Sequence, residues 1–380
     1  MLHTTALLPV LQAHLQWHPS RLRFLILFLT ALLKVTTVNL AKVANAFSAQ
    51  AQVSSHYRRI QRFLALFQID YSSYARLLLA LIPAPPNHLG QLPCFIVSID
   101  RTNWKFGKSD INILMAAIVH QGTAFPLVWR LIPTAGSSNV EERTDLIDAL
   151  LEVLPAWRIK VLVADREFIG ALWFQRLCER RIAFSIRLRG NTVVEHTTAS
   201  RCKRQTVHRQ FAHLQRGEQS SLRKPRRLLC HRLYLSAVRT EKSLIIVASN
   251  RPGIQALNAY RQRWGIEVLF GVLKRRGFDF ECTHLQARQR IEKLVALLAL
   301  AYVWAYRIGQ WQARRRAIPI KKHGRKARSL FRTGLDYLQH VLLHPVAKRS
   351  QWETCLWLLI DPLVMTLLDL GENTPKSLNF

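Results

Sequence analysis

The run Cys94-Phe-Ile-Val-Ser-Ile-Asp100 is short, mostly apolar and ends in an acid. That pattern predicts a buried central strand that delivers a carboxylate at its end. A second run, Ile159-Lys-Val-Leu-Val-Ala-Asp165, repeats the arrangement. Each aspartate, taken alone, is also compatible with an ordinary turn residue at a strand end. Together the two runs predict a sheet that carries two carboxylates at one edge.

The surrounding segments alternate between strand and helix patterns. The turn His120-Gln-Gly122-Thr separates two strands, and Ser138 or Asn139 is expected to cap the following helix. Three antiparallel strands, a helix, a strand, a helix and a strand predict a mixed α/β fold. The expected strands cover 94–104, 111–120, 123–132, 159–165, 183–188 and 243–249, and the expected helices cover 139–154 and 171–180.

The most informative motif is Tyr260-Arg-Gln-Arg263-Trp-Gly-Ile-Glu267-Val-Leu-Phe-Gly-Val-Leu-Lys274. On a straight helix, the tyrosine, arginine, glutamate and lysine of this motif fall within an arc of roughly 60° over about 21 Å. A carboxylate among such groups suits a metal ligand flanked by residues that hold a polyanionic substrate. The alternative is an exposed helix with a simple Arg263–Glu267 ion pair. With Asp100 and Asp165, Glu267 would supply oxygen ligands for two Mg²⁺ or Mn²⁺ ions.

These acids and their spacing resemble those of the bacterial insertion-sequence DDE transposases of the fourth insertion-sequence family. The shared signature is Tyr-x2-Arg-x3-Glu-x6-Lys around the third acid. Ser98-Ile-Asp100-Arg-Thr-Asn-Trp104-Lys105 and Ala164-Asp165-Arg166-Glu167-Phe168 are similar to the family's blocks around the first two acids. The resemblance covers the chain from about residue 90 to residue 285.

The resemblance implies an RNase H-like catalytic core with a β-rich insertion, flanked by an N-terminal helical domain and a C-terminal helical region. It implies that Asp100, Asp165 and Glu267 are the catalytic acids and hold two Mg²⁺ or Mn²⁺ ions, and that Tyr260, Arg263 and Lys274 contact DNA. The implied reaction is DNA cleavage at element ends followed by strand transfer into target DNA. The implied partners are double-stranded DNA, as terminal inverted repeats and target, and a second copy of the chain on paired ends.

Charge and length agree with this interpretation. Lys and Arg number 55 against 23 Asp and Glu, so the formal net charge is +32 and the sequence pI is about 11.0. A polyanionic partner explains such an excess. We expect a helical DNA-binding domain over 1–82, the catalytic core over 90–190 and 241–284, the insertion over 191–240 and the helical region over 285–380.

Two further segments are candidates for DNA contact. In the N-terminal part, Asn39–Phe47 and Ser54–Phe63 predict two helices with a short turn, the second capped by Ser54 or Ser55. Its basic and aromatic side chains would enter a major groove, although a helical bundle with a basic surface fits equally. The residues proposed for this contact are His56, Tyr57, Arg59 and Arg62.

The expected insertion holds eleven Lys and Arg residues against Glu195 and Glu218. A β-rich insert that grips DNA accounts for this cation density, and a solvated basic loop is the alternative. No tryptophan lies between Asn191 and Tyr260, so Phe211 or Tyr234 would have to stack any flipped base. The cations expected to hold phosphates are Arg223, Lys224, Arg226 and Arg227.

The remaining features narrow the class of protein. The apolar run Phe24–Leu33 stops at Lys34 and is too short to span a membrane, so a buried helix and no membrane partner are expected. The six cysteines show no zinc-type spacing, which favours reduced thiols and a cytoplasmic, nucleoid-associated protein. Two rivals share the acids: a metal-dependent nuclease or resolvase without strand transfer, and a catalytically inactive DNA-binding relative.

Overall fold

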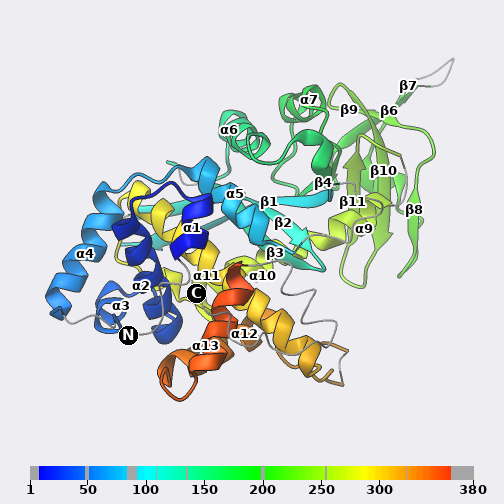
Figure 1. The fold of residues 1–380 in the computed structure, drawn as a ribbon. Helices are drawn as coiled ribbons and strands as arrows, with labels where there is room; N and C mark the ends of the chain where they lie inside the picture. Colours follow the sequence, from blue (N-terminus) through cyan, green and yellow to red (C-terminus); the bar gives the residue numbers. More distant parts are fainter. Residues whose placement is uncertain are drawn as a thin grey trace. The chain divides into compact units, whose positions relative to one another are not determined.

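A computed structural model describes residues 8–47, 51–83, 92–107, 109–133, 136–197, 202–252, 255–322 and 324–360 (Figure 1). The chain forms two compact units. One consists of Met1–Pro83 with Gly271–Phe380, and the other is Ala84–Phe270. The two ends of the chain therefore fold together, and the middle of the chain forms a unit of its own.

The middle unit is built on one mixed sheet. Its strands lie in the order β3-β2-β1-β4-β5-β11-β10-β9-β6-β7, with β8 paired to β10. The strand bounds are β1 (Phe95–Phe106), β2 (Ser109–His120), β3 (Thr123–Leu131), β4 (Ile159–Ala164), β5 (Phe184–Arg187), β6 (Val193–Thr197), β7 (Cys202–Thr206), β8 (Gln219–Ser221), β9 (Arg226–Leu228), β10 (His231–Arg239) and β11 (Leu244–Ser249).

The strand directions place the two aspartates beside each other. β1 runs antiparallel to β2 and parallel to β4. In the parallel pair Ile99 lies opposite Ala164, so the next residues, Asp100 within β1 and Asp165 just after β4, lie beside each other where this pairing ends. β1 itself continues past the acid to Phe106, beyond the strand end that the sequence pattern predicted. Strands β2 and β3 complete an antiparallel meander, and β5 pairs parallel with β4. This order confirms the mixed α/β fold with an RNase H-like core.

Helices pack against this sheet. The bounds are α6 (Val140–Leu151), η2 (Ala156–Arg158), α7 (Ala171–Glu179), α8 (Val207–Gln210), α9 (Gln255–Gln262) and α10 (Trp264–Gly271). Asn139 caps α6 in a reciprocal capping box with Glu142, which confirms the second of the two expected caps. Helix α6 contacts β2 and β3, and α9 contacts β1, β4, β5, β10 and β11.

The single straight helix expected over Tyr260–Lys274 is wrong. α9 ends at Gln262, α10 starts at Trp264, and the last turn is the π-helix η3 (Val272–Arg276). At the break, the Arg263 N–H donates to Tyr260 O at 3.0 Å, a tighter turn than the α-helical pattern. A π turn also shifts every later residue around the axis, so the calculated arc does not extend to Lys274.

The segment expected as an insertion is β-rich. It contains β6, β7, β8, β9 and β10. β10 pairs with β11, and β11 pairs antiparallel with β5, so the central sheet continues into this segment. The backbone hydrogen bonds of the segment are thereby joined to those of the core.

The other unit is helical. Its elements are α1 (Leu8–His14), α2 (Pro19–Val35), α3 (Leu40–Asn45), α4 (Val53–Leu66), α5 (Tyr71–Leu81), η3, η4 (Phe280–Cys282), α11 (Arg288–Arg315), α12 (Leu330–Leu343) and α13 (Arg349–Ile360). The apolar run Phe24–Leu33 lies in α2 and is largely buried, as expected. Among the described helices, none has the length and apolar character needed to cross a membrane.

The expected details of α4 need correction. Its N-cap residue is Gln52, whose side chain makes no capping bond, so neither Ser54 nor Ser55 caps the helix. His56 is buried beside the Phe47 ring, at 5.2 Å between centroids, and is therefore unavailable for a DNA groove. The exposed side chains of α4 include Arg58 and Arg62, one turn apart.

Gly265 allows α10 to approach the β2–β3 turn closely. A Cβ at this position would lie 2.9 Å from Gly122 O and 3.1 Å from Ala124 N. We predict that Gly265→Ala lowers the free energy of unfolding by about 1–3 kcal/mol. The added carbon would clash with backbone atoms of the β2–β3 turn, which cannot move aside as the end of a flexible side chain can. Chemical denaturation measures the change. In Gly190→Ala, the matched control, the added carbon meets His208 Cβ at an ordinary 3.6 Å, so equal losses in both variants would contradict the prediction.

Candidate active site

Three carboxylates lie close to one another at the point where the pairing of β1 with β4 ends. Asp100 lies in β1 just past the last residue paired with β4, and Asp165 directly follows β4. Neighbouring strands are about 4.8 Å apart, so the pairing alone brings the two acids together. Glu267 comes from the first turn of α10. The side chains of Asp100, Asp165 and Glu267 are 15%, 29% and 36% exposed, so solvent reaches all three.

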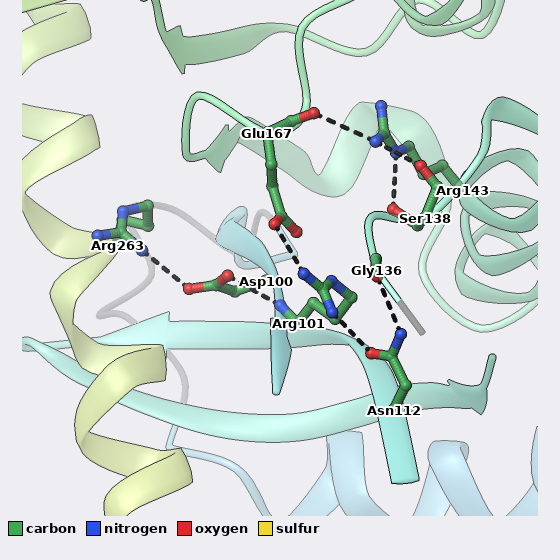
Figure 2. A network of polar contacts seen from close by, with 8 residues as sticks. All are labelled: Asp100, Arg101, Asn112, Gly136, Ser138, Arg143, Glu167 and Arg263. Carbon is green, nitrogen blue, oxygen red and sulfur yellow. Dashed lines mark hydrogen bonds and ion pairs between the residues drawn. The ribbon is translucent and has the colours of Figure 1, made fainter. Parts of the chain in front are cut away.

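Arg263 links two of these acids. Its Nη1 donates to Asp100 Oδ2 at 2.8 Å, and its Nη2 donates to Glu267 Oε1 (Figure 2 draws the Asp100 contact). The guanidinium also lies over the Tyr260 ring, 5.6 Å from its centroid. Only 8% of the Arg263 side chain is exposed. The arginine is therefore an internal counter-ion for the carboxylates.

Asp165 has its own partners. The Tyr260 hydroxyl donates to Asp165 Oδ1 at 3.1 Å, and Arg187 Nη1 lies 3.6 Å from the same oxygen. Arg187 ends β5, the strand next to β4. This arginine was not expected from the sequence, although its place at the end of a predicted strand was a usable signal.

The electrostatics of the site favour a cation. Burial, with smaller contributions from the nearby Glu167 and Asp165, raises the pKa of Asp100 to about 6, against the opposing effects of Arg263 and of the Arg101 N–H. Burial also raises the pKa of Tyr260, so its hydroxyl stays a donor. Burial lowers the pKa of Arg263, but Tyr260 and the acids raise it more. A positive charge at this place is stabilised by its surroundings.

A second polar network lies behind Asp100 (Figure 2). Arg101 donates to Asn112 Oδ1 at 3.1 Å and to Glu167 Oε2 at 3.4 Å. Arg143 donates to the Glu167 carbonyl at 3.2 Å and to Ser138. The sequence assigned no role to these residues, although Arg101 and Glu167 fall within the blocks that resemble the family.

The donor set fits a divalent ion in chemistry. Carboxylate oxygens are the ligands that Mg²⁺ and Mn²⁺ prefer. Within the described ranges, however, no three His, Cys, Asp or Glu side chains form a ready cation cluster. The reason is visible at Arg263, which holds one oxygen each of Asp100 and Glu267. For an ion to bind these two oxygens, the Arg263 guanidinium would have to break its hydrogen bonds to them.

The other candidate residues make contacts of their own. Lys274 belongs to the helical unit and pairs with Glu281 Oε1 at 3.5 Å. Arg59 lies over the Phe24 ring at 5.4 Å, and Arg62 is exposed. Of the four cations proposed for the insertion, three are exposed and Arg226 is half-buried; the exposed ones are Arg223, Lys224 and Arg227.

Three aromatic residues bear on base stacking. Phe211 is fully buried, so it cannot stack a base. Tyr234 is half-buried. Trp264, next to Arg263, is 64% exposed and offers the kind of aromatic face that stacks bases. Trp264 lies outside the insertion, to which the sequence-based expectation of a stacking residue was confined.

Comparison with known families gives the identity. The family model described as a transposase DDE domain matches residues 95–304, which is more than half of the 380 residues. The chain therefore belongs to the DDE transposases, enzymes that transfer phosphoryl groups of DNA and generally use divalent metal ions. No curated protein matches the sequence.

The counter-ion role of Arg263 can be tested without metal. We predict that Arg263→Gln, unfolded by denaturant in EDTA, loses about 3 kcal/mol of stability, because Asp100 remains largely enclosed without a cation. Adding Asp100→Asn should recover part of the loss. Arg180→Gln is the control, because its pair with Asp148 is more exposed and should contribute at most about 1 kcal/mol. Equal effects of the two arginines would refute the role.

Proposed function

We propose that this DDE transposase is an insertion-sequence transposase of the fourth insertion-sequence family, which cuts DNA at element ends and transfers the cut strand into target DNA. The main support is that Asp100 of β1 and Glu267 of α10 share Arg263, with Asp165, just after β4, beside Asp100. The signature Tyr-x2-Arg-x3-Glu-x6-Lys adds to this support.

Asp100, Asp165 and Glu267 would hold two Mg²⁺ or Mn²⁺ ions, whose chemistry is to activate a water or a 3′-hydroxyl and to stabilise the leaving oxygen. Hydrolysis and strand transfer would then share one site. Tyr260 orients Asp165 through its hydroxyl. Ion binding would release Arg263 from its bonds to the carboxylates, and the guanidinium would then bind the scissile phosphate. The same side chain would thus neutralise the acids before the reaction and contact the substrate during it.

DNA contacts would come from several elements. Arg223, Lys224, Arg226 and Arg227 lie on and before β9 of the β-rich segment, where they would hold phosphates irrespective of sequence. Lys274 would add a phosphate contact, and Trp264 would stack a displaced base. On α4, Arg58 and Arg62 would read the element end, with Arg59 supporting the helix against Phe24. Two copies of the chain would act on paired ends.

The acids are tested by conservative amides. We predict that Asp100→Asn, Asp165→Asn or Glu267→Gln abolishes Mg²⁺-dependent nicking of an end-containing duplex, because the carboxylates serve the ions. DNA affinity should stay within about threefold, since these side chains make no phosphate contact. Asp148→Asn, a surface carboxylate paired with Arg180, serves as the control. Full-rate nicking by the Glu267→Gln protein would remove that residue from the site.

Strand transfer separates the proposed enzyme from a nuclease. A pre-cut end with a free 3′-hydroxyl is incubated with plasmid DNA, and joined products are measured. The proposed transposase should join the end to the plasmid in a reaction that needs Mg²⁺ or Mn²⁺. A nuclease or resolvase would cut without joining, and a catalytically inactive relative would do neither.

The DNA-contacting cations should divide into two kinds. Neutralising Arg223, Lys224, Arg226 and Arg227 together should lower affinity for all DNA alike and flatten the slope of log affinity against log salt by up to about 0.9 for each phosphate that is no longer neutralised. Arg58→Ala with Arg62→Ala should instead reduce discrimination between element end and random duplex. Binding measured at several salt concentrations, with competitor DNA, separates the two. Unchanged discrimination in the α4 variant would show that the end is read elsewhere.

A further inference from the structure

Arg101, in the middle of β1, connects this strand to the turn that follows Asp165. Its backbone N–H donates to Asp100 Oδ1 at 2.8 Å. Its side chain, 14% exposed, donates to Asn112 on β2 and to Glu167 Oε2. One residue therefore contacts the first acid through its main chain and the turn after β4 through its side chain.

Glu167 belongs to that turn. It lies two residues after Asp165, and the turn closes with a bond from Phe168 N to Asp165 O at 3.0 Å. The Glu167 carbonyl accepts a bond from Arg143 of α6, whose guanidinium also lies over the Phe168 ring at 4.9 Å. Two arginines therefore hold the turn. Arg143 of α6 bonds to the backbone carbonyl of Glu167, and Arg101 of β1 bonds to the Glu167 carboxylate.

The Glu167 carboxylate is retained at an energetic cost. Its Oε1 is buried and has no hydrogen-bond partner among the residues that the structure describes. A buried acceptor without a partner destabilises the folded protein. A buried carboxylate oxygen without a partner is typical of a functional site rather than of a stabilising core.

We propose that Arg101 and Glu167 form a positioning pair, which holds the carboxylates of Asp100 and Asp165 in register for the DNA cleavage reaction. The inference rests on the proposed role of those two acids. Neither member of the pair is one of the three proposed catalytic acids. Arg101 acts through the bond of its N–H to Asp100, and Glu167 acts through the turn that begins at Asp165.

The test compares Glu167→Gln, Arg101→Met and the double variant as full-length proteins. The readouts are the single-turnover nicking rate at saturating protein, the DNA dissociation constant and the Mn²⁺ concentration that gives half the maximal rate. We expect each single change to slow nicking by about 10- to 100-fold and to raise the Mn²⁺ requirement, as changes behind metal-binding carboxylates do. DNA affinity should stay within about twofold, because the side chains of the pair bond to each other and to Asn112 rather than to phosphates.

The double variant shows whether the two residues act together. If they form one unit, the double variant should be no slower than the slower single variant. The control is Asp148→Asn, which breaks a pair with Arg180 at 2.7 Å and 2.9 Å in the same unit and lies outside this network. It should nick DNA at the normal rate.

The outcomes separate the pair from the acids. A normal rate and normal Mn²⁺ requirement in Glu167→Gln, or fully additive losses in the double variant, would overturn the positioning role. Full activity of Asp100→Asn would instead overturn the proposed function. If thermal unfolding shows that Glu167→Gln is not folded, Glu167→Asp keeps the charge but withdraws it from Arg101, and normal nicking by both that variant and Arg101→Met would refute the proposal.

Discussion

The parallel pairing of β1 with β4 is the constraint on which the site depends. Parallel strands cannot be joined by a tight turn and need a crossover connection. Here the connection leaves β1 at Phe106, passes through β2, β3 and α6, and returns at Ile159, where β4 begins. Because the register sets Ile99 opposite Ala164, it also sets Asp100 beside Asp165. The polar contacts around the acids all build on this placement.

Placing carboxylates side by side creates a charge problem that the surrounding residues solve. Arg263 bonds to Asp100 and Glu267, and Arg187 lies beside Asp165. Like charges in a half-buried site repel one another, so without cations the acids would stay partly protonated or splay apart. The arginine that neutralises the acids is also the residue that the signature assigns to the substrate. The positive charge of Arg263 can thus neutralise the acids before the reaction and a phosphate during it.

Much of the fold could be predicted because it follows from local patterns. Apolar runs ending in an acid predicted β1 and β4, and a cap at Ser138 or Asn139 predicted the start of α6, where the structure has Asn139. The straight helix over Tyr260–Lys274 is wrong, because the helix is interrupted at Arg263 and a π turn follows Gly271. The roles expected of His56 and Phe211 fail because both side chains are buried in the fold, which residue type alone does not indicate.

By itself, the sequence determined the succession of strands and helices in the core, the positions of the three acids, the signature spacing and the strong positive charge, because residue type and periodicity encode these directly. Only the tertiary structure decided which cation contacts which acid, that Tyr260 holds Asp165, and that Arg101 and Glu167 bridge the two acid-bearing segments. Those contacts join residues as far apart as Asp100 and Arg263, whose proximity arises from strand register and packing rather than from any local pattern.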